Sequence, residues 1–354
     1  MQNSKNVENL KKILVVRNDK LGDLLVSFST FALLKQNLPH TEIHVLVSDY
    51  TAPMAKMCEF IDQVIIDPAT VEANHQPGAF RLMNQLSKQL EQNQYDAVIT
   101  LFSTLHVALA AFLARIPLRI APATKIAQIF YNIRLRQQRS RSEMPESRYN
   151  EQLAELLLAQ YSITSIKPVK PPFLHFNPAE IHTLKQRFLT QHNIPDNHQL
   201  VFIHPGSGGS AGNLSIPQFA RLANALTSTK PFTIVITSGP GQEESRIAKQ
   251  LSQQISCENV LFESKAGLEN FSQHLQFVDC LICGSTGPLH IAGALDRPTA
   301  AFYTRRQSAT ALRWQTLNSE KNRLAFSPPD ESEPENMANI DIHLAAKDIS
   351  QNFL

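Results

Sequence analysis

The sequence contains few cysteines. Only four occur in 354 residues, and they are too scattered for a disulfide framework. We therefore expect a reducing, cytoplasmic compartment. The spacing Cys280-x-x-Cys283 suggests a metal or redox site, but residues three apart on a strand point to opposite faces and no second pair accompanies them. We expect both thiols to be small core side chains.

The sequence also lacks an excess of charge of one sign, since 33 basic and 31 acidic residues give a net charge of +2. Nucleic-acid binders usually carry a strong basic excess, so this class is disfavoured. The N-terminus has no apolar core of a signal peptide, and no apolar run reaches the roughly 18 to 20 residues that span a bilayer. The longest, LHVALAAFLARIPL, contains His106 and Arg115 and indicates a buried helix. An integral membrane protein is therefore not expected, whereas peripheral association with a membrane remains open.

Short apolar runs alternate with helical patterns along the chain, which predicts parallel sheets covered on both faces. A stretch with four prolines, residues 165–178, separates two similar halves. We predict an α/β fold of two Rossmann-like, doubly wound domains that face each other across a cleft. The domains comprise residues 1–168 and 169–340. Residues 341–354 are expected to form a C-terminal helix that could pack on either domain. The candidate strands are 13–16, 43–47, 63–66, 97–101, 200–204, 232–237, 260–262, 278–283 and 300–303.

The first strand is followed by RNDKLGD, where a phosphate-binding loop would have several glycines. Here Gly22 is followed directly by Asp23, and a carboxylate repels phosphate. Asp23 could simply cap a helix, because aspartate favours the first turn. If phosphate is bound in the second half instead, a carboxylate is expected here when this domain holds an acceptor whose proton must be removed.

The segment HPGSGGSAGN follows a strand and precedes a helix, which is typical of an anion-binding loop. It imitates a dinucleotide fingerprint, but it lies in the second half and no acid follows about 20 residues later. A plain flexible turn is the alternative. The residues that we expect to bind a donor here are Ser207, Gly208, Gly209, Ser210 and Asn213.

The segment CGSTGPLHIAGAL places small and hydroxyl side chains between a buried strand and a helix. A helix N-terminus with hydroxyls and an imidazole suits a diphosphate leaving group. Ordinary capping, with the histidine packed inside, is the alternative. The candidate residues are Ser285, Thr286, Gly287, Pro288 and His290.

The run RLRQQRSRSEMPESRYN contains five arginines and is opposed only by Glu143 and Glu146. It indicates either a solvated loop or a contact with a phosphorylated, membrane-borne acceptor, because arginine matches the geometry of phosphate. The candidate residues are Arg134, Arg136, Arg139 and Arg141. No Asp-x-Asp pair lies at a strand end, so we expect no metal and no cofactor.

Taken together and in order, these segments resemble glycosyltransferase family 9, the lipopolysaccharide heptosyltransferases, over roughly residues 12–315. The resemblance implies a GT-B fold, with the acceptor mainly on the first domain and the nucleotide-sugar mainly on the second. It implies metal-independent transfer with inversion, typically from ADP-heptose to the core of lipopolysaccharide or lipooligosaccharide. The partners implied are the nucleotide-sugar, a lipid-linked phosphorylated saccharide and the inner-membrane surface, with no nucleic acid.

The resemblance also implies roles for single residues. Asp23 matches the family's catalytic base, with Gly22 beside the acceptor, and Glu244 matches an acid that contacts the donor ribose, although Glu243 is a rival alignment. Thr286, Gly287 and His290 match the family's donor-diphosphate turn.

Two departures from the family's pattern affect the donor site. Gly212-Asn213 stands where these enzymes often have a lysine, and Ser285 where many have an aspartate associated with the heptose. A different nucleotide-sugar donor and a non-catalytic binding relative therefore remain as alternatives.

Overall fold

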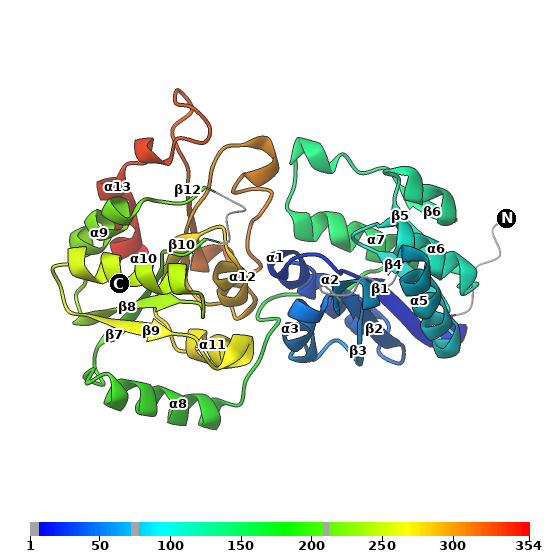
Figure 1. The fold of residues 1–354 in the computed structure, drawn as a ribbon, viewed down its shortest axis with the longest axis horizontal. Coiled ribbons are helices and arrows are strands. Elements are labelled where there is room, and N and C mark those ends of the chain that lie inside the picture. Colours follow the sequence, from blue (N-terminus) through cyan, green and yellow to red (C-terminus); the bar gives the residue numbers. More distant parts are fainter. Residues whose placement is uncertain (1–6, 72–77, 208–211) are drawn as a thin grey trace. The chain divides into compact units, whose positions relative to one another are not determined.

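The computed structural model describes residues 7–71, 78–207 and 212–354. Contacts divide the chain into two compact units. The first comprises the residues up to Arg139 together with Met144–Phe173, and the second comprises Ser140–Glu143 and Leu174–Leu354. Each unit is an α/β domain built on one six-stranded sheet (Figure 1). Within the described ranges, no helix is long and apolar enough to cross a membrane.

The first sheet is wholly parallel, in the order β3-β2-β1-β4-β5-β6. This is the doubly wound order, in which the connections reverse direction between β1 and β4. Val16, the last residue of β1, lies beside Leu46 on one side and Thr100 on the other. The strands are β1 (Lys12–Val16), β2 (Glu42–Val47), β3 (Gln63–Ile66), β4 (Ala97–Thr100), β5 (Leu118–Pro122) and β6 (Ile133–Leu135).

Alternation along the strands gives this sheet two apolar faces. Leu14 and Val16 of β1 pack with Met83 and Val107, so α5 and α6 cover their face. On the other face α2 and α7 pack against each other, as expected when crossovers reverse direction about β1 (Figure 1). The helices of this unit are α1 (Leu21–Leu25), α2 (Phe28–Asn37), α3 (Ala52–Lys56), α4 (Pro68–Val71), α5 (Ala79–Asn93), α6 (Leu105–Leu113) and α7 (Glu146–Gln160).

The second sheet repeats the same pattern, in the order β12-β11-β10-β7-β8-β9 and again wholly parallel. Its connections reverse between β7 and β10, where Cys283 lies beside His204. The strands are β7 (Gln199–His204), β8 (Phe232–Ser238), β9 (Asn259–Glu263), β10 (Cys280–Gly284), β11 (Thr299–Phe302) and β12 (Arg323–Phe326).

The C-terminal helix belongs to the second unit. Ile342 and Ile349 share a buried apolar cluster with Phe219 and Ile234, so α13 packs beside α9 on one face of the sheet. An aromatic group around Phe188, whose ring lies 5.7 Å from that of Phe277, covers the other face. The helices of this unit are α8 (Pro178–Gln191), α9 (Ile216–Ala225), α10 (Gln242–Gln254), α11 (Gly267–Leu275), α12 (Gly287–Ala294) and α13 (Ile342–Phe353).

All nine predicted strands are present, with ends displaced by at most two residues, but three further strands were missed. They are β5, β6 and β12. Arg119 and Pro122 interrupt the apolar pattern of β5, and β6 has only three residues within the basic run. The prediction of a loop for that run was therefore wrong in part, since it contains β6 and leads into α7.

Candidate functional site

The candidate site residues of the first unit lie where β1 ends, next to the point at which the sheet connections reverse. Ligands of doubly wound sheets bind outside the carboxyl ends of the strands at this point. Arg17, Asn18 and Asp19 follow β1 directly, and Asp23 lies one helical turn further on, in the short helix α1. The sequence therefore concentrates its polar side chains at the expected edge of the sheet.

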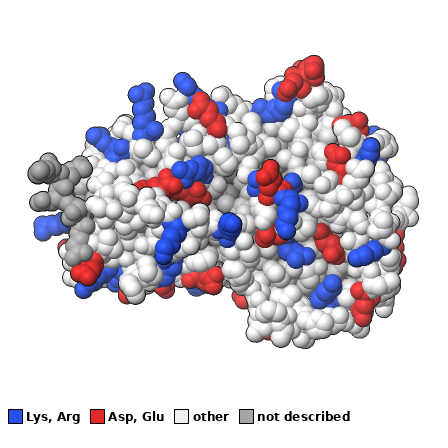
Figure 2. All heavy atoms as spheres, turned by 180° about the vertical axis from the view of Figure 1, so that it is seen from behind, with Lys and Arg blue, Asp and Glu red and all other residues white. Residues whose placement is uncertain are grey.

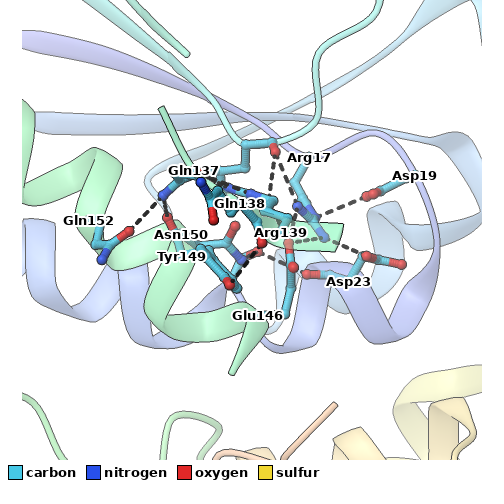
Figure 3. A network of polar contacts seen from close by, with 12 residues as sticks. Arg17, Asp19, Asp23, Gln137, Gln138, Arg139, Glu146, Tyr149, Asn150 and Gln152 are labelled. Atoms are coloured by element: carbon cyan, nitrogen blue, oxygen red, sulfur yellow. Dashed lines mark hydrogen bonds and ion pairs between the residues drawn. The ribbon is translucent and has the colours of Figure 1, made fainter. Parts of the chain in front are cut away.

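A buried arginine joins three carboxylates at this edge (Figure 3). The side chain of Arg17 is only 2% exposed. Its Nη2 donates to Asp23 Oδ1 at 2.5 Å and to Glu146 Oε1 at 3.3 Å, and its Nε lies 3.1 Å from Asp19 Oδ1. Glu146, in the first turn of α7, is brought from 129 residues away. One guanidinium thus fixes the relative positions of three acids.

A second arginine supports the same network. Arg139 Nη1 donates to Glu146 Oε1 at 2.6 Å, and its other nitrogens donate to Gln137 Oε1 at 2.9 and 3.0 Å. The guanidinium also lies 5.6 Å from the ring of Tyr149. Arg139, which was predicted to bind the acceptor, therefore lies within the network that holds Glu146 (Figure 3).

Asp23 is the most exposed of the three carboxylates in the network. Its side chain is 16% exposed, compared with 12% for Asp19 and 3% for Glu146. Oδ1 accepts the bond from Arg17, and within the described residues no hydrogen bond engages Oδ2. Asp23 does not cap α1, because it is the third residue of that helix and the cap position is Lys20. One oxygen is therefore fixed in place while the other remains available to a ligand.

Charges within the network shift the proton affinities of its members. Burial raises the pKa of Asp19 to about 7, and the carboxylates of Asp23 and Glu146 add to the rise while Arg17 opposes it. For Arg17, burial favours loss of the proton, but the three acids outweigh it and raise the pKa of the guanidinium further above its ordinary value. Arg17 is therefore a permanent cation, whereas Asp19 changes charge near neutral pH.

We expect Asp19→Asn to remove a pH dependence of stability. Because the folded-state pKa of Asp19 is raised to about 7, the native state holds a proton that the unfolded state has lost, and wild-type stability falls as pH rises from about 4 to 7. Above pH 7 the variant should be more stable than the wild type, by roughly 1–3 kcal/mol, whereas near pH 4 the difference should vanish. Urea denaturation across this range measures it.

The exposed Asp49→Asn is the matched control for this measurement, because it makes the same change at a surface carboxylate. A constant offset for Asp19→Asn would contradict the expectation.

A second polar cluster occupies the same edge of the first sheet. Asp67, at the end of β3, is fully buried and accepts from Asn18 Nδ2 at 2.5 Å. His106 Nε2, at the start of α6, lies 2.9 Å from the same carboxylate oxygen. Burial opposes ionisation of Asp67, but its bonds to His106 and Asn18 prevail and lower its pKa. Asn18 and Asp19 thus link two neighbouring networks.

In the second unit, the candidate donor residues gather where β7, β8 and β10 end. Asn213 donates to the carbonyl of Pro205 at 2.9 Å, and its Oδ1 would lie 2.6 Å from a Cβ placed on Gly284. Glu244 accepts from the backbone N–H of Gly239 at 2.6 Å. These contacts require glycine at two strand ends and bring the two side chains to one edge of the sheet.

The structure also distinguishes the two neighbouring glutamates at the start of α10. Glu243 is 68% exposed and pairs with Arg246 at 2.5 Å, along the surface of the helix. Glu244 instead lies beside His204, which burial holds neutral by lowering its pKa to about 4. The geometry thus favours Glu244 over Glu243 as a donor contact.

The turn after β10 places Ser285 and Thr286 ahead of α12, with Thr286 at the N-cap position, Gly287 first in the helix and Pro288 next. His290 is 5% exposed, and its ring lies 6.3 Å from that of Trp314. Burial lowers the pKa of His290 to about 4, so it is neutral at pH 7. It can therefore offer a hydrogen bond to a diphosphate but not the positive charge that we considered for it.

The remaining predicted residues are dispersed. Gly208, Gly209 and Ser210 lie outside the described residues, and Ser207 is exposed at the end of that segment. Arg134, on the edge strand β6, and Arg136 are exposed, and Arg141 is 61% exposed with Glu143 at 3.6 Å. Gly22 precedes Asp23 in α1.

Both members of the Cys280-x-x-Cys283 pair are fully buried, and burial raises the pKa of the Cys283 thiol to about 12. They are protonated core side chains, as predicted.

Sequence reasoning did not identify Arg17, Asp19, Glu146, Asp67 or His106 as site residues. Part of the signal was present, because an arginine, an asparagine and an aspartate directly after a buried strand are unusual unless they serve the edge of the sheet. Glu146 was noticed only as a counter-charge in the basic run. Its link to Arg17 spans 129 residues and has no local signal.

Comparison with known proteins identifies the group to which this architecture is similar. The family model described as glycosyltransferase family 9 (heptosyltransferase) matches residues 83–333. A Haemophilus influenzae protein named "Putative glycosyltransferase" is 39% identical over 96% of both chains. The lipooligosaccharide heptosyltransferase 2 of Haemophilus ducreyi is 28% identical over 81% of both chains.

A solved structure has the same fold. The Escherichia coli ADP-heptose lipopolysaccharide heptosyltransferase II superposes with a TM-score of 0.74, covering 97% of this chain and 98% of that chain at 16% identity. The likeness confirms the predicted GT-B fold of two doubly wound domains.

Proposed function

Because the chain belongs to glycosyltransferase family 9, we propose that it transfers heptose from ADP-heptose to the core of lipopolysaccharide or lipooligosaccharide, with inversion and without a metal. That the chain is a glycosyltransferase follows from the family. The relatives named as heptosyltransferases support the choice of donor and acceptor. We further propose that the enzyme works on the cytoplasmic side, at the inner face of the inner membrane.

The observation that carries the proposed mechanism is the state of Asp23. Arg17 fixes Oδ1 of this carboxylate, whereas Oδ2 is left to a ligand. A general base needs a positioned and accessible oxygen within hydrogen-bonding reach of the proton that it removes. The position of Asp23 at the carboxyl edge of the first sheet supports this role.

In the proposed reaction, Asp23 Oδ2 accepts the proton of one acceptor hydroxyl as its oxygen attacks the anomeric carbon of the donor. The bond from that carbon to the diphosphate oxygen breaks on the opposite side, and the nucleoside diphosphate leaves with the electron pair. A single displacement of this kind inverts the anomeric configuration. Asp23 then releases its proton to solvent.

The second unit supplies the proposed donor contacts. Glu244, in the first turn of α10, would accept hydrogen bonds from ribose hydroxyls, because the N–H of Gly239 holds its carboxylate beside the end of β8. Thr286 and the N–H groups that begin α12 would bind the diphosphate, since a helix N-terminus stabilises negative charge. Asn213 and Ser207 complete the set.

One difference from the family's pattern, in the turn before α12, favours a second candidate donor. Ser285 stands where many heptosyltransferases have an aspartate associated with the heptose. A hydroxyl is uncharged and can donate as well as accept, so it would suit a sugar with a different arrangement of hydroxyls. The reaction and the base would be unchanged.

A donor screen tests the proposal directly. We expect ADP-heptose to raise the melting temperature of the protein more than UDP-, GDP- or other ADP-sugars do, and turnover with lipooligosaccharide core to persist in EDTA. Stabilisation by another nucleotide-sugar alone would establish the second candidate. Loss of turnover in EDTA would contradict metal independence.

Gly284→Ala should weaken donor binding, because its new methyl group would lie 2.6 Å from Asn213 Oδ1 and displace that side chain. Overpacking of this kind costs about 1–3 kcal/mol. If that cost falls on the position of Asn213 in the donor site, the donor Kd should rise by roughly 5- to 150-fold. Calorimetric titration with ADP measures it. Gly241→Ala is the matched control, since nothing lies within 4 Å of its Cβ position. Equal affinity in both variants would remove Asn213 from the donor site.

A further inference from the structure

One segment of the chain departs strongly from its balanced composition. The 46 residues from Ala97 to Ser142 contain no acidic residue and seven basic ones, whereas the average of the chain predicts about four acids in such a length. Elsewhere both signs are mixed, and Figure 2 shows them interspersed over one face of the molecule. A local excess of positive charge of this size attracts an anionic partner to this segment.

The same segment also exposes large apolar side chains, on α6 and on the 3-10 helix η3 (Ile126–Phe130). Among the described residues twelve large apolar side chains are exposed, and five of them lie within the 25 residues from 105 to 129. They are Leu105 at 56%, Phe112 at 47%, Leu113 at 44%, Ile126 at 78% and Ile129 at 65%. We call these five residues the α6–η3 surface.

The two helices form one surface because they pack together. Phe112 of α6 and Phe130 of η3 lie with their ring centroids 5.6 Å apart, and Ala108 and Ala127 share a buried cluster beneath them. Arg119 fixes this arrangement, since it donates to the carbonyl of Phe130 at 2.8 Å while its guanidinium lies 5.4 Å from the Phe112 ring. The apolar tips are therefore held in place.

Cations surround the α6–η3 surface. Lys125 directly precedes Ile126 and lies 5.3 Å from the ring of Phe102, and Arg115 follows Ala114, the C-cap residue of α6. Arg134 and Arg136 continue the series along the edge strand β6 and are exposed. In the part of the chain that the structure describes, none of these four side chains forms an ion pair with a carboxylate.

We propose that the α6–η3 surface docks the enzyme on an anionic phospholipid bilayer, with its apolar side chains in the boundary between headgroups and acyl chains and its cations on lipid phosphates. Apolar burial and attraction to anionic lipid are the two contributions that hold a protein at such an interface. A second copy of the chain fits less well, because it would bring cations of the same sign together. The inference rests on the proposed function in one respect only, since the lipid-linked acceptor is what gives the enzyme a reason to bind a membrane.

Co-sedimentation of the full-length protein with vesicles tests the inference. We expect binding to vesicles of phosphatidylglycerol and phosphatidylethanolamine in equal amounts, little binding to phosphatidylcholine, and a loss of binding as salt is raised. The double variant Ile126→Ser/Ile129→Ser should lower the partition coefficient onto vesicles at least about tenfold, because both isoleucine side chains would otherwise enter the bilayer. Lys125→Gln/Arg134→Gln should lower partitioning roughly fivefold for each charge removed.

The matched control is Leu261→Ser/Leu344→Ser, which removes two similarly exposed apolar side chains from the second unit, at 41% and 54%, and should bind like the wild type. Asp23→Asn should also bind normally, because the vesicles contain neither donor nor saccharide acceptor, so this test and that of the proposed function can fail separately. Unchanged partitioning of the isoleucine variant would overturn the inference. A second result would also overturn it: light scattering that shows a wild-type dimer which the isoleucine variant converts to a monomer, together with no binding of the wild type to vesicles.

Discussion

Asp23→Asn should lower kcat for sugar transfer by about 10²–10⁴-fold, the contribution typical of a general base. The amide has nearly the shape of the carboxylate, but it cannot accept the proton of the acceptor hydroxyl. Donor binding should be unchanged within about twofold, since the proposed donor contacts all lie in the second unit. Initial rates with saturating donor and acceptor, together with calorimetric titration of ADP, separate the two effects.

The control for this experiment is Asp49→Asn, which changes an exposed carboxylate in the same way and should leave the rate unaltered. Urea denaturation must show that the Asp23 variant is folded, because Arg17 loses one of its three acids. If Asp19→Asn caused the larger loss of rate, the base would be Asp19. If neither variant slowed transfer, the edge of the first sheet would not hold the base.

The fold could be predicted from the sequence because the apolar pattern of a central parallel strand is local. Lys12–Val16 and Ala97–Thr100 are buried runs in the middle of the first sheet, and such runs are visible without any partner. The three strands that were missed, β5, β6 and β12, did not have this pattern. Neither β6 nor β12 contains a fully buried residue, and Arg134 in β6 is exposed, so neither segment needed to be apolar.

The candidate site could be predicted only in part, for a related reason. Asp23 follows its strand closely, but its position alone also suited a helix cap, and the family resemblance indicated it as the base. What surrounds Asp23 is set by tertiary contacts, because Glu146 and Arg139 come from a segment more than 100 residues away. The same contacts explain why the arginines of the basic run differ in role. Arg139 is held by Glu146, whereas Arg134 remains at the surface.

Arg17→Gln should lower the free energy of unfolding of the first unit by about 3–5 kcal/mol at neutral pH, the cost of leaving buried charges without their counter-ion. Glutamine cannot replace the positive charge, and three carboxylates would face one another at the end of β1. Arg17→Lys should lose less, since it keeps the charge, but one ammonium cannot reach all three acids as the guanidinium does.

The expected loss of unfolding free energy depends on pH and is confined to the first unit, and these two properties distinguish it from nonspecific destabilisation. Protonation removes the uncompensated negative charge, so the deficit of Arg17→Gln relative to the wild type should shrink as pH falls from about 8 to 5. Hydrogen exchange should show the loss at β1 and β4, with β7 and β10 as the internal reference, because the network lies within the first unit. The exposed Arg187→Gln is the matched control. A deficit that is independent of pH, or equal in both sheets, would mean that Arg17 acts by packing and not by charge.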